Sequence, residues 1–376
     1  MRRSTIALTR TALSALHYSG LGALLAPLAR GKGVIFTLHN VRPEPPEPFA
    51  PNRILKVTPE FLETAIESVR GAGYDIVSLD EAARRMSVAA PAPFACFTFD
   101  DGYRDNRDYA YPVFKRHGLP FAIYVPTVYA DGEGDLWWFV LEQAIRKADQ
   151  LRVVLGGVER RFETRTTEQK DAAFDAIYWT LRAGPEIELR ATVRKIADAA
   201  GYDPSRLCRD LIMDWDELRA LAADPLVTIG AHTRRHFAVA QLSEDEARAE
   251  IAESVARIER ELGRPCRHFS FPYGDAGSAG PRDFAIARSL GLATAVTTQK
   301  DVLRARNALT GLPRISLNGD YQEARYVRAM MTGVPSLALD TVKASLARVR
   351  GLRGARGPEK AVASGAAATR PGAASI

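Results

Sequence analysis

Two adjacent carboxylates end an apolar run in the segment FTFDDGYRDN, residues 97–106. Successive side chains of a strand point to opposite faces, so Asp100 and Asp101 reach one site only if the chain turns at Asp101–Gly102. Two charged acids at the end of a buried strand are costly unless a cation or a function explains them. The pair indicates acid–base or metal chemistry, and an ordinary Asp-Gly turn is the alternative.

Two histidines form the second candidate group. His232 and His236 lie four residues apart in GAHTRRHF (230–237), at the end of another predicted strand. On a helix or helix-like turn this spacing puts both imidazoles on one face, although taken alone they could be surface or core residues. With Asp101 they would give three protein ligands and leave positions open for water and substrate, which is typical of a catalytic metal. Asp100 could then take a proton from that water.

A third strand end, FSFPYGD (269–275), could direct backbone N–H groups at a developing oxyanion. On its own this segment could also be an ordinary aromatic-proline turn. All three motifs follow predicted strands, and barrel active sites are built at the carboxyl ends of strands.

Short apolar runs and helical patterns alternate along the rest of the chain and must position these motifs. Near-continuous apolar strands are typical of a parallel sheet or barrel covered by helices. The order repeats β then α about seven times, which favours an α/β fold of the (β/α) barrel type over an open sheet. The predicted strands are residues 33–38, 74–79, 94–99, 120–125, 227–232, 268–273, 293–298 and 312–317.

The chain is expected to have three parts. Residues 1–32 read as an amphipathic N-terminal helix, which could lie on a membrane or pack on the body, without a cleaved signal peptide. Residues 33–340 form the barrel domain, interrupted at 131–213 by a mainly helical insertion with no convincing strand. Residues 341–376 read as a basic tail that is expected to be disordered.

The charge is concentrated at the two ends. The net charge is +6, but residues 1–32 carry five basic residues and no acid, and residues 341–376 carry seven basic residues and one acid. The body is therefore mildly acidic, which argues against a nucleic-acid partner and leaves room for peripheral contact with an anionic membrane surface. Three scattered cysteines argue against disulfides and favour a reducing, cytoplasmic location.

The combination of TFDDG with H-T-x-x-H resembles the polysaccharide deacetylase family, also called carbohydrate esterase family 4, over roughly residues 33–330. The resemblance implies a distorted (β/α) barrel of about seven parallel strands. It also implies that Asp100 is the catalytic base, that Asp101, His232 and His236 bind a divalent metal ion, with Zn²⁺ as the default, and that the Tyr273 backbone N–H helps hold the oxyanion. The substrate would be an N-acetylated glycan.

Departures from the family pattern affect three positions. An Arg that usually contacts the base is replaced by Ser270, the last strand LPRISLNGD lacks the late His that supplies the general acid, and no Trp follows Trp215. His39 at the end of FTLHN and Arg314 in the last strand could fill the gaps. The alternatives without a catalytic role are that His39 is an ordinary turn residue and that Arg314 forms an ion pair in the barrel wall.

Aromatic residues complete the predicted site. Trp138, with its neighbour Trp137 in the insertion, could stack on a sugar ring, or could be core, and Pro272 and Tyr273 are expected to contact substrate. The sequence predicts hydrolysis of an N-acetyl group on an amino sugar of a polysaccharide, oligosaccharide or lipid-linked glycan. The alternatives are a deformylase or deacylase of a lipid-linked amino sugar and a catalytically dead sugar-binding relative.

Overall fold

The computed structural model describes residues 3–45, 47–338 and 341. The chain divides into two compact units, Met1–Ser336 and Leu337–Ile376, and the fold and the site belong to the first. The basic tail expected at 341–376 lies outside the described residues, apart from Thr341.

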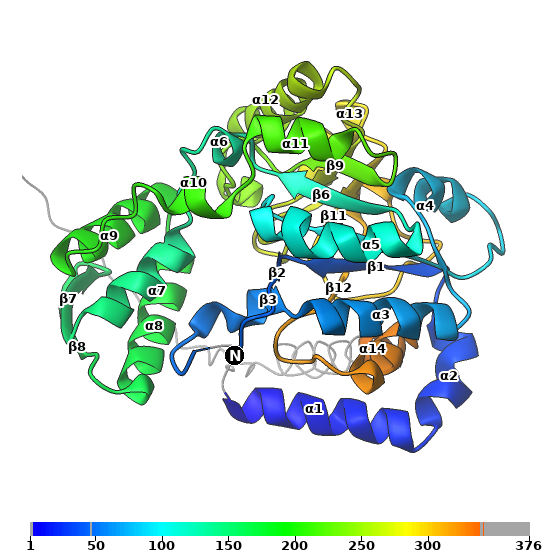
Figure 1. The fold of residues 1–376 in the computed structure, drawn as a ribbon, viewed down its shortest axis with the longest axis horizontal. Coiled ribbons are helices and arrows are strands. Elements are labelled where there is room, and N and C mark those ends of the chain that lie inside the picture. Colours follow the sequence, from blue (N-terminus) through cyan, green and yellow to red (C-terminus); the bar gives the residue numbers. More distant parts are fainter. Residues whose placement is uncertain (1–2, 46, 339–340, 342–376) are drawn as a thin grey trace, which may run out of the picture. The chain divides into compact units, whose positions relative to one another are not determined.

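A curled parallel sheet forms the centre of the first unit (Figure 1). Seven strands follow the order β11-β10-β9-β6-β5-β1-β12, and the short β4 pairs with β5 alone. A parallel bridge between Val296 and Leu312 joins the two ends of the curl. The predicted distorted (β/α) barrel of about seven parallel strands is confirmed. Its strands are β1 (Gly33–Leu38), β4 (Asp75–Ile76), β5 (Phe94–Phe99), β6 (Phe121–Val125), β9 (Val227–Ala231), β10 (His268–Ser270), β11 (Thr294–Val296) and β12 (Ile315–Ser316).

Helices cover the sheet, and they begin at the capping residues that the sequence contains. Thr58 accepts a hydrogen bond from the Phe61 N–H at the start of α3, and Ser243 forms a capping box at the start of α12. Every residue of β1 and β5 is buried, as their unbroken apolar sequences predict. The covering helices are α3 (Pro59–Gly71), α4 (Leu79–Met86), α5 (Tyr111–His117), α6 (Thr127–Ala130), α11 (Trp215–Ala222), α12 (Glu244–Leu262), α13 (Pro281–Ser289) and α14 (Ala324–Met331).

The insertion after β6 has a core of its own, built around Trp137, Trp138 and Leu141. The expectation of several helices here is met, but the expectation of no convincing strand is wrong. Leu151, Val153 and Leu155 alternate with exposed residues, and Gly156–Gly157 turn at positive φ, so this stretch forms an antiparallel hairpin. The elements are α7 (Trp137–Lys147), β7 (Gln150–Leu155), β8 (Val158–Glu163), α8 (Thr167–Arg182), α9 (Glu186–Ala199) and α10 (Leu207–Leu211).

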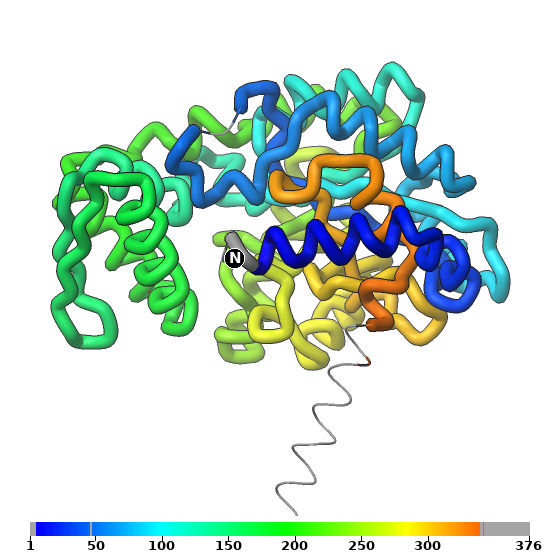
Figure 2. The backbone as a smooth tube through the Cα atoms, turned by 90° about the horizontal axis from the view of Figure 1, so that it is seen from below, coloured from blue at the N-terminus to red at the C-terminus, as the bar shows by residue number. Residues whose placement is uncertain are grey.

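The N-terminal segment forms two helices where one was expected. They are α1 (Arg3–Tyr18) and α2 (Leu21–Ala29), and they meet at a 91° bend. Gly20 has a φ of 73°, which suits glycine and produces the break. Ile6 and Leu13 of α1 are buried against Tyr326 and Ala329, so α1 packs along α14 (Figure 2).

Candidate active site

Asp100 and Asp101 follow β5 and are both buried. Asp101 and Gly102 have φ values of 75°, so the chain turns where the sequence required it to. A Cβ at position 102 would come within 3.2 Å of the Val125 side chain, and glycine avoids that contact. This turn brings both carboxylates to the carboxyl edge of the sheet.

Asp101, His232 and His236 come together as a buried triad. The Oδ1 of Asp101 lies 3.2 Å from Nε2 of His236 and 3.6 Å from Nε2 of His232. Ligand atoms held tetrahedrally at about 2.1 Å from one zinc lie about 3.4 Å from each other. Asp101 Oδ1 is buried without a hydrogen-bond partner, which a bound cation would satisfy. The donor set therefore fits a divalent metal ion.

The surroundings of His232 prepare it as a ligand. Its Nδ1 lies 2.6 Å from the carbonyl oxygen of Ser270, so Nδ1 carries the proton and Nε2 faces Asp101. Burial lowers the pKa of His232 to about 4, which keeps the ring neutral near pH 7. Neutral imidazole is the form that binds a metal.

Arg314, directly before the last strand β12, holds Asp100. Its Nη1 and Nη2 donate to the two carboxylate oxygens at 2.8 and 2.6 Å, and the side chain is fully buried, with 0% exposed. The same guanidinium donates to Ser270 Oγ at 2.9 Å. Burial by itself raises the pKa of Asp100, but the charge and hydrogen bonds of Arg314 outweigh it and keep the pKa below its ordinary value. The cation that position 270 lacks thus comes from the residue directly before β12.

Tyr273 lies beside the triad, in the loop after β10. Its ring centroid is 4.9 Å from that of His236, and the preceding Pro272 is buried. Its φ of 59° is unusual for a residue with a side chain and sets the direction of its N–H. Within the described chain this N–H forms no hydrogen bond, so it is free to donate to a substrate oxygen.

His39 ends β1 on the same edge of the sheet. The carbonyl of the preceding Leu38 accepts a hydrogen bond from the Asp100 N–H at 3.0 Å, which places the His39 backbone beside the two carboxylates. The other non-ligand histidines lie elsewhere: His117 pairs with Glu63 on outer helices, and His268 contacts Thr294 at the amino end of β10. His17 is in α1.

Asp105 belongs to the first motif, but the sequence did not predict a role for it. Its Oδ1 accepts hydrogen bonds from the Val41 N–H at 3.2 Å and from Asn106 Nδ2 at 3.1 Å. Asn106 Nδ2 also donates to the His39 carbonyl at 2.6 Å. Burial raises the pKa of Asp105 to about 7. This pair ties the motif loop to the strand end that carries His39.

Trp138 packs against the metal-ligand loop. It is only 5% exposed, and its ring centroid lies 5.2 Å from that of His236. Such a ring offers little free face to a sugar, so the core description suits it better, and its substrate role stays a prediction. Trp179 on α8 is the exposed tryptophan of the insertion.

The insertion braces the site through Glu186, a residue that the sequence analysis missed. Its buried carboxylate accepts hydrogen bonds from the Tyr273 hydroxyl at 2.8 Å and from the Ala238 N–H at 2.9 Å. Arg190 pairs with Glu186 at 2.8 Å and donates to the His236 carbonyl at 3.2 Å. Glu186 opens α9, far from both motifs in sequence, and no local pattern marked it.

Backbone strain is concentrated at this site. The non-glycine residues with positive φ in the described chain are Asp101, Thr233, His236 and Tyr273. Such conformations cost about 1–3 kcal/mol each and persist where the surroundings over-determine them. Glu186 and Arg190 contact both the His236 loop and Tyr273, and these contacts supply that restraint.

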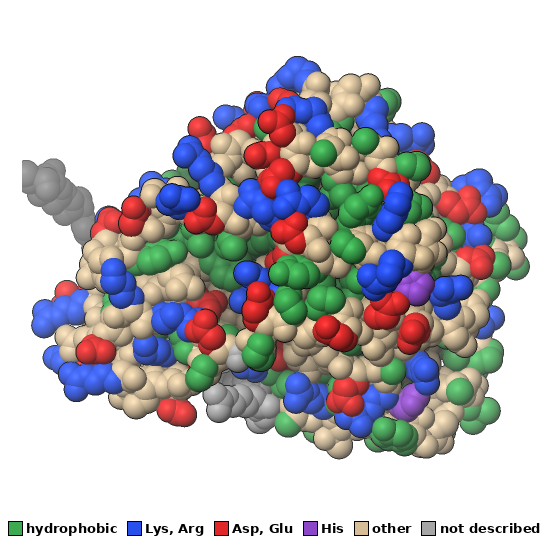
Figure 3. All heavy atoms as spheres, in the orientation of Figure 1, with side chains coloured by type: hydrophobic (Ala, Val, Ile, Leu, Met, Phe, Trp, Pro, Cys, Tyr) green, Lys and Arg blue, Asp and Glu red, His purple; other side chains and the backbone are tan. Residues whose placement is uncertain are grey.

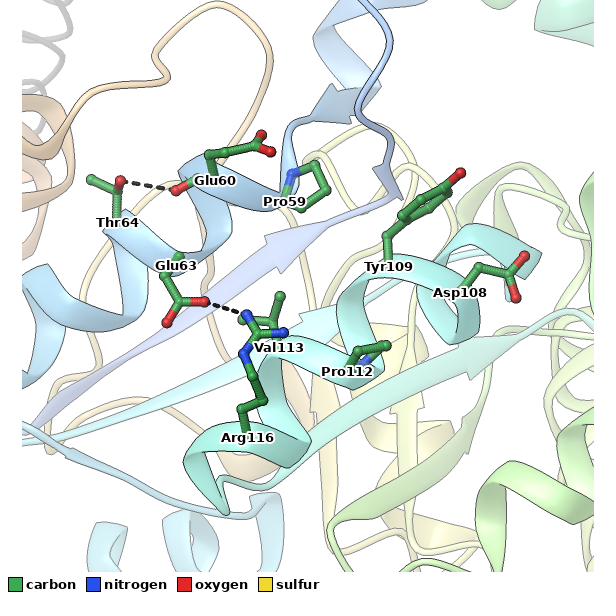
Figure 4. Close-up of a pocket in the computed structure, with 9 residues that line it drawn as sticks. All are labelled: Pro59, Glu60, Glu63, Thr64, Asp108, Tyr109, Pro112, Val113 and Arg116. Atoms are coloured by element: carbon green, nitrogen blue, oxygen red, sulfur yellow. Dashed lines mark hydrogen bonds and ion pairs between the residues drawn. The ribbon is translucent and has the colours of Figure 1, made fainter.

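A separate pocket lies on outer helices, between α3 and α5 together with the segment just before α5 (Figure 4). Its floor includes the Arg116–Glu63 ion pair at 2.8 Å. None of the triad residues lines it, so it is not the site of the predicted chemistry. Its lining is Pro59, Glu60, Glu63, Thr64, Asp108, Tyr109, Pro112, Val113 and Arg116.

Comparison with known structures shows the same fold. The Streptococcus pyogenes deacetylase PplD in complex with acetate is 18% identical, with a TM-score of 0.51, and the match covers 77% of this chain and 93% of that one. IcaB from Ammonifex degensii is 18% identical, with a TM-score of 0.50, and the match covers 80% of this chain and 97% of that one. These likenesses concern the fold alone.

Comparison of sequences identifies the family. No match is found among the curated proteins. Residues 87–295, which include both carboxylates, both histidines and Tyr273, match the family described as polysaccharide deacetylase. That match spans more than half of the chain, and the resemblance noted from the motifs is confirmed. The chain belongs to the polysaccharide deacetylase family.

Proposed function

We propose that this chain removes N-acetyl groups from an amino sugar of a glycan in a reaction that depends on a divalent metal ion. Membership of the family makes it a hydrolase of carbon–nitrogen amide bonds, and de-N-acetylation of a glycan is the family's reaction. The metal dependence and the roles of individual residues are the new part of this proposal. They rest on the geometry of the buried triad and of Asp100.

Asp101, His232 and His236 would hold the metal ion, and zinc suits this donor set. When bound, such an ion acts as a Lewis acid toward the acetyl carbonyl and acidifies water. Asp100 takes the proton from the attacking water, because Arg314 keeps it ionised.

Two further groups complete the proposed reaction. The free N–H of Tyr273 donates to the oxygen that becomes negative when water adds to the carbonyl. His39 donates a proton to the departing amine, since it directly follows Leu38, whose carbonyl accepts the Asp100 N–H. The C–N bond then breaks to give acetate and a free amino sugar.

One observation carries the proposal: a buried carboxylate paired with a cation stands next to a second carboxylate that faces two imidazoles. The same two neighbouring residues are thus held in different electrostatic settings. A protein that only binds a metal ion has no need of Asp100 as a ligand, because Asp100 is not one of the triad residues.

The decisive experiment is mass spectrometry of N-acetylated and N-formylated amino-sugar oligosaccharides after incubation with the enzyme. We expect loss of acetyl, abolished by a chelator and restored by zinc. Asp100→Asn should retain metal and lose about 10²–10⁴ in rate. Loss of formyl alone would favour the deformylase alternative. Binding of the glycan without turnover in the metal-loaded protein would favour a dead relative and refute the proposal.

A further inference from the structure

Helix α2 presents its leucines to solvent. Leu21, Leu24, Leu25 and Leu28 follow helical spacing along one side, and Leu24 and Leu28 are 72% and 83% exposed. Figure 3 shows hydrophobic side chains at the corner of the molecule where Figure 1 places α2. A row of exposed leucines on one helix marks an interaction surface rather than chance exposure.

The other side of α2 is built from small residues and faces the protein. Gly22 and Ala29 are buried. A Cβ at Gly22 would lie 3.3 Å from the Leu16 side chain and 3.4 Å from that of Thr332, so the helix approaches its neighbours closely there. The orientation is therefore fixed by packing, and the leucine row cannot turn inward.

A basic residue stands at the end of the row. The sequence contains no Asp or Glu before Glu44, and Arg30 directly follows α2 with an exposed side chain. Arg328 of α14, the helix that packs against α1, is also exposed, and neither arginine forms an ion pair within the described chain. An apolar row beside unpaired cations matches the surface of a bilayer whose interior is apolar and whose headgroups are negatively charged.

We propose that the α2 leucine row docks on a bilayer that contains anionic lipids. No single described helix is long and apolar enough to cross a bilayer, and α1 and α2 qualify only as a pair bent by 91°. Because α1 is fixed against α14, α2 would lie in the membrane interface without spanning it. Tyr18, exposed beside the bend, suits the same boundary.

The docked face lies away from the site. Helix α2 leads into the amino end of β1, while Asp100 and Asp101 follow the carboxyl end of the neighbouring β5. The contact would therefore hold the enzyme at a surface without covering the triad. Activity on a soluble substrate is expected to be independent of the row.

The test is co-sedimentation of the full chain with vesicles of phosphatidylcholine, with and without phosphatidylglycerol. We expect binding to the mixed vesicles, with weaker binding to phosphatidylcholine alone and in about 1 M salt, where screening acts within about 3 Å. Leu24→Ser and Leu28→Ser should each weaken partitioning at least about tenfold, because each removes one inserted leucine. Arg30→Glu should weaken binding only to the anionic vesicles.

Val158→Ser and Ile187→Ser, at exposed aliphatic positions on the insertion, serve as matched controls and should bind as the wild type does. Unchanged melting temperature and unchanged hydrolysis of a soluble substrate would show that the α2 variants remain folded. Absence of vesicle binding by the wild type would overturn the proposal. So would wild-type self-association that Leu24→Ser abolishes without vesicles, since the row would then bind a second copy.

Discussion

Replacing Arg314 with methionine removes the charge that faces Asp100 while leaving a long apolar side chain in the barrel. In the structure both carboxylate oxygens accept hydrogen bonds from the guanidinium, and neither partner is open to solvent. Burial alone raises the pKa of Asp100, and the charge of Arg314 is the largest opposing influence. The variant should therefore need a higher pH to ionise its base.

The size of the effect follows from the burial of the pair. Removing one partner of a buried ion pair costs about 3–5 kcal/mol. One pKa unit corresponds to about 1.4 kcal/mol, so if a third of that cost reaches the protonation equilibrium, the pKa of Asp100 rises by about one unit. The acidic limb of the kcat/KM profile should move upward by at least about one unit, with about a tenfold loss at acidic pH.

The assay is the pH profile of kcat/KM on a soluble N-acetylated oligosaccharide, with metal content and melting temperature measured on each variant. Arg304→Met is the matched control, because Arg304 forms a comparable two-bond pair with Asp301, at 3.0 Å, away from the site. It should lower the melting temperature without moving the limb. Combining Ser270→Arg with Arg314→Ser should move the limb back, since Ser270 Oγ already lies 2.9 Å from the guanidinium.

An Arg314→Met enzyme with wild-type kcat and an unmoved acidic limb would refute this reasoning. Asp100 would then be ionised, or dispensable, without its cation. Loss of the bound metal in the same variant would also count against it, because the pair would then support the triad rather than the base.

Three further predictions concern the metal, the brace and the motif loop. His232→Ala removes one of three ligands, and tight binding of one metal per chain after dialysis against a chelator would rule out this site. Glu186→Gln should weaken metal binding or activity about 10- to 100-fold, while Glu188→Gln, at an exposed position, should not. If both variants lose metal to a competing chelator equally, Glu186 does not support the metal site. The raised pKa of Asp105 means that its contribution to stability is present below its unfolded pKa of about 4 and is lost as pH rises through about 7. Asp105→Asn should therefore raise the melting temperature relative to wild type more at about pH 8 than at about pH 5, and a pH-independent difference would contradict this.

The fold could be predicted because its signals are local. Unbroken apolar runs such as Gly33–Leu38 and Phe94–Phe99 specify buried parallel strands, and all eight predicted strands are present, several of them shorter than expected. The triad could be located because each ligand follows a strand end. Parallel strands bring their carboxyl ends to one edge, so the two segments that carry the ligands had to meet there although they are distant in sequence.

The supporting residues could not be found in this way. Glu186 lies near the start of a helix in the insertion, and its contact with Tyr273 depends on how the insertion docks. Arg314 could be suggested only because Ser270 left a gap, and its two hydrogen bonds depend on side-chain packing inside the barrel. The hairpin at 150–163 did have a local signal, alternating residues around Gly156–Gly157, which was missed among helical patterns.

Because the cation for Asp100 lies directly before β12, near the end of the barrel domain, the order of synthesis matters for this protein. A nascent chain ending before residue 314 has already made β1 and β5, yet it holds no guanidinium to neutralise the carboxylate between them. Burial of that carboxylate would be opposed until the last strand pairs with β1. We therefore expect the pairing of β12 with β1 and the ionisation of Asp100 to occur together, late in biosynthesis. A chain truncated before Arg314 should leave the edge of β1 unpaired and be a target for proteolysis.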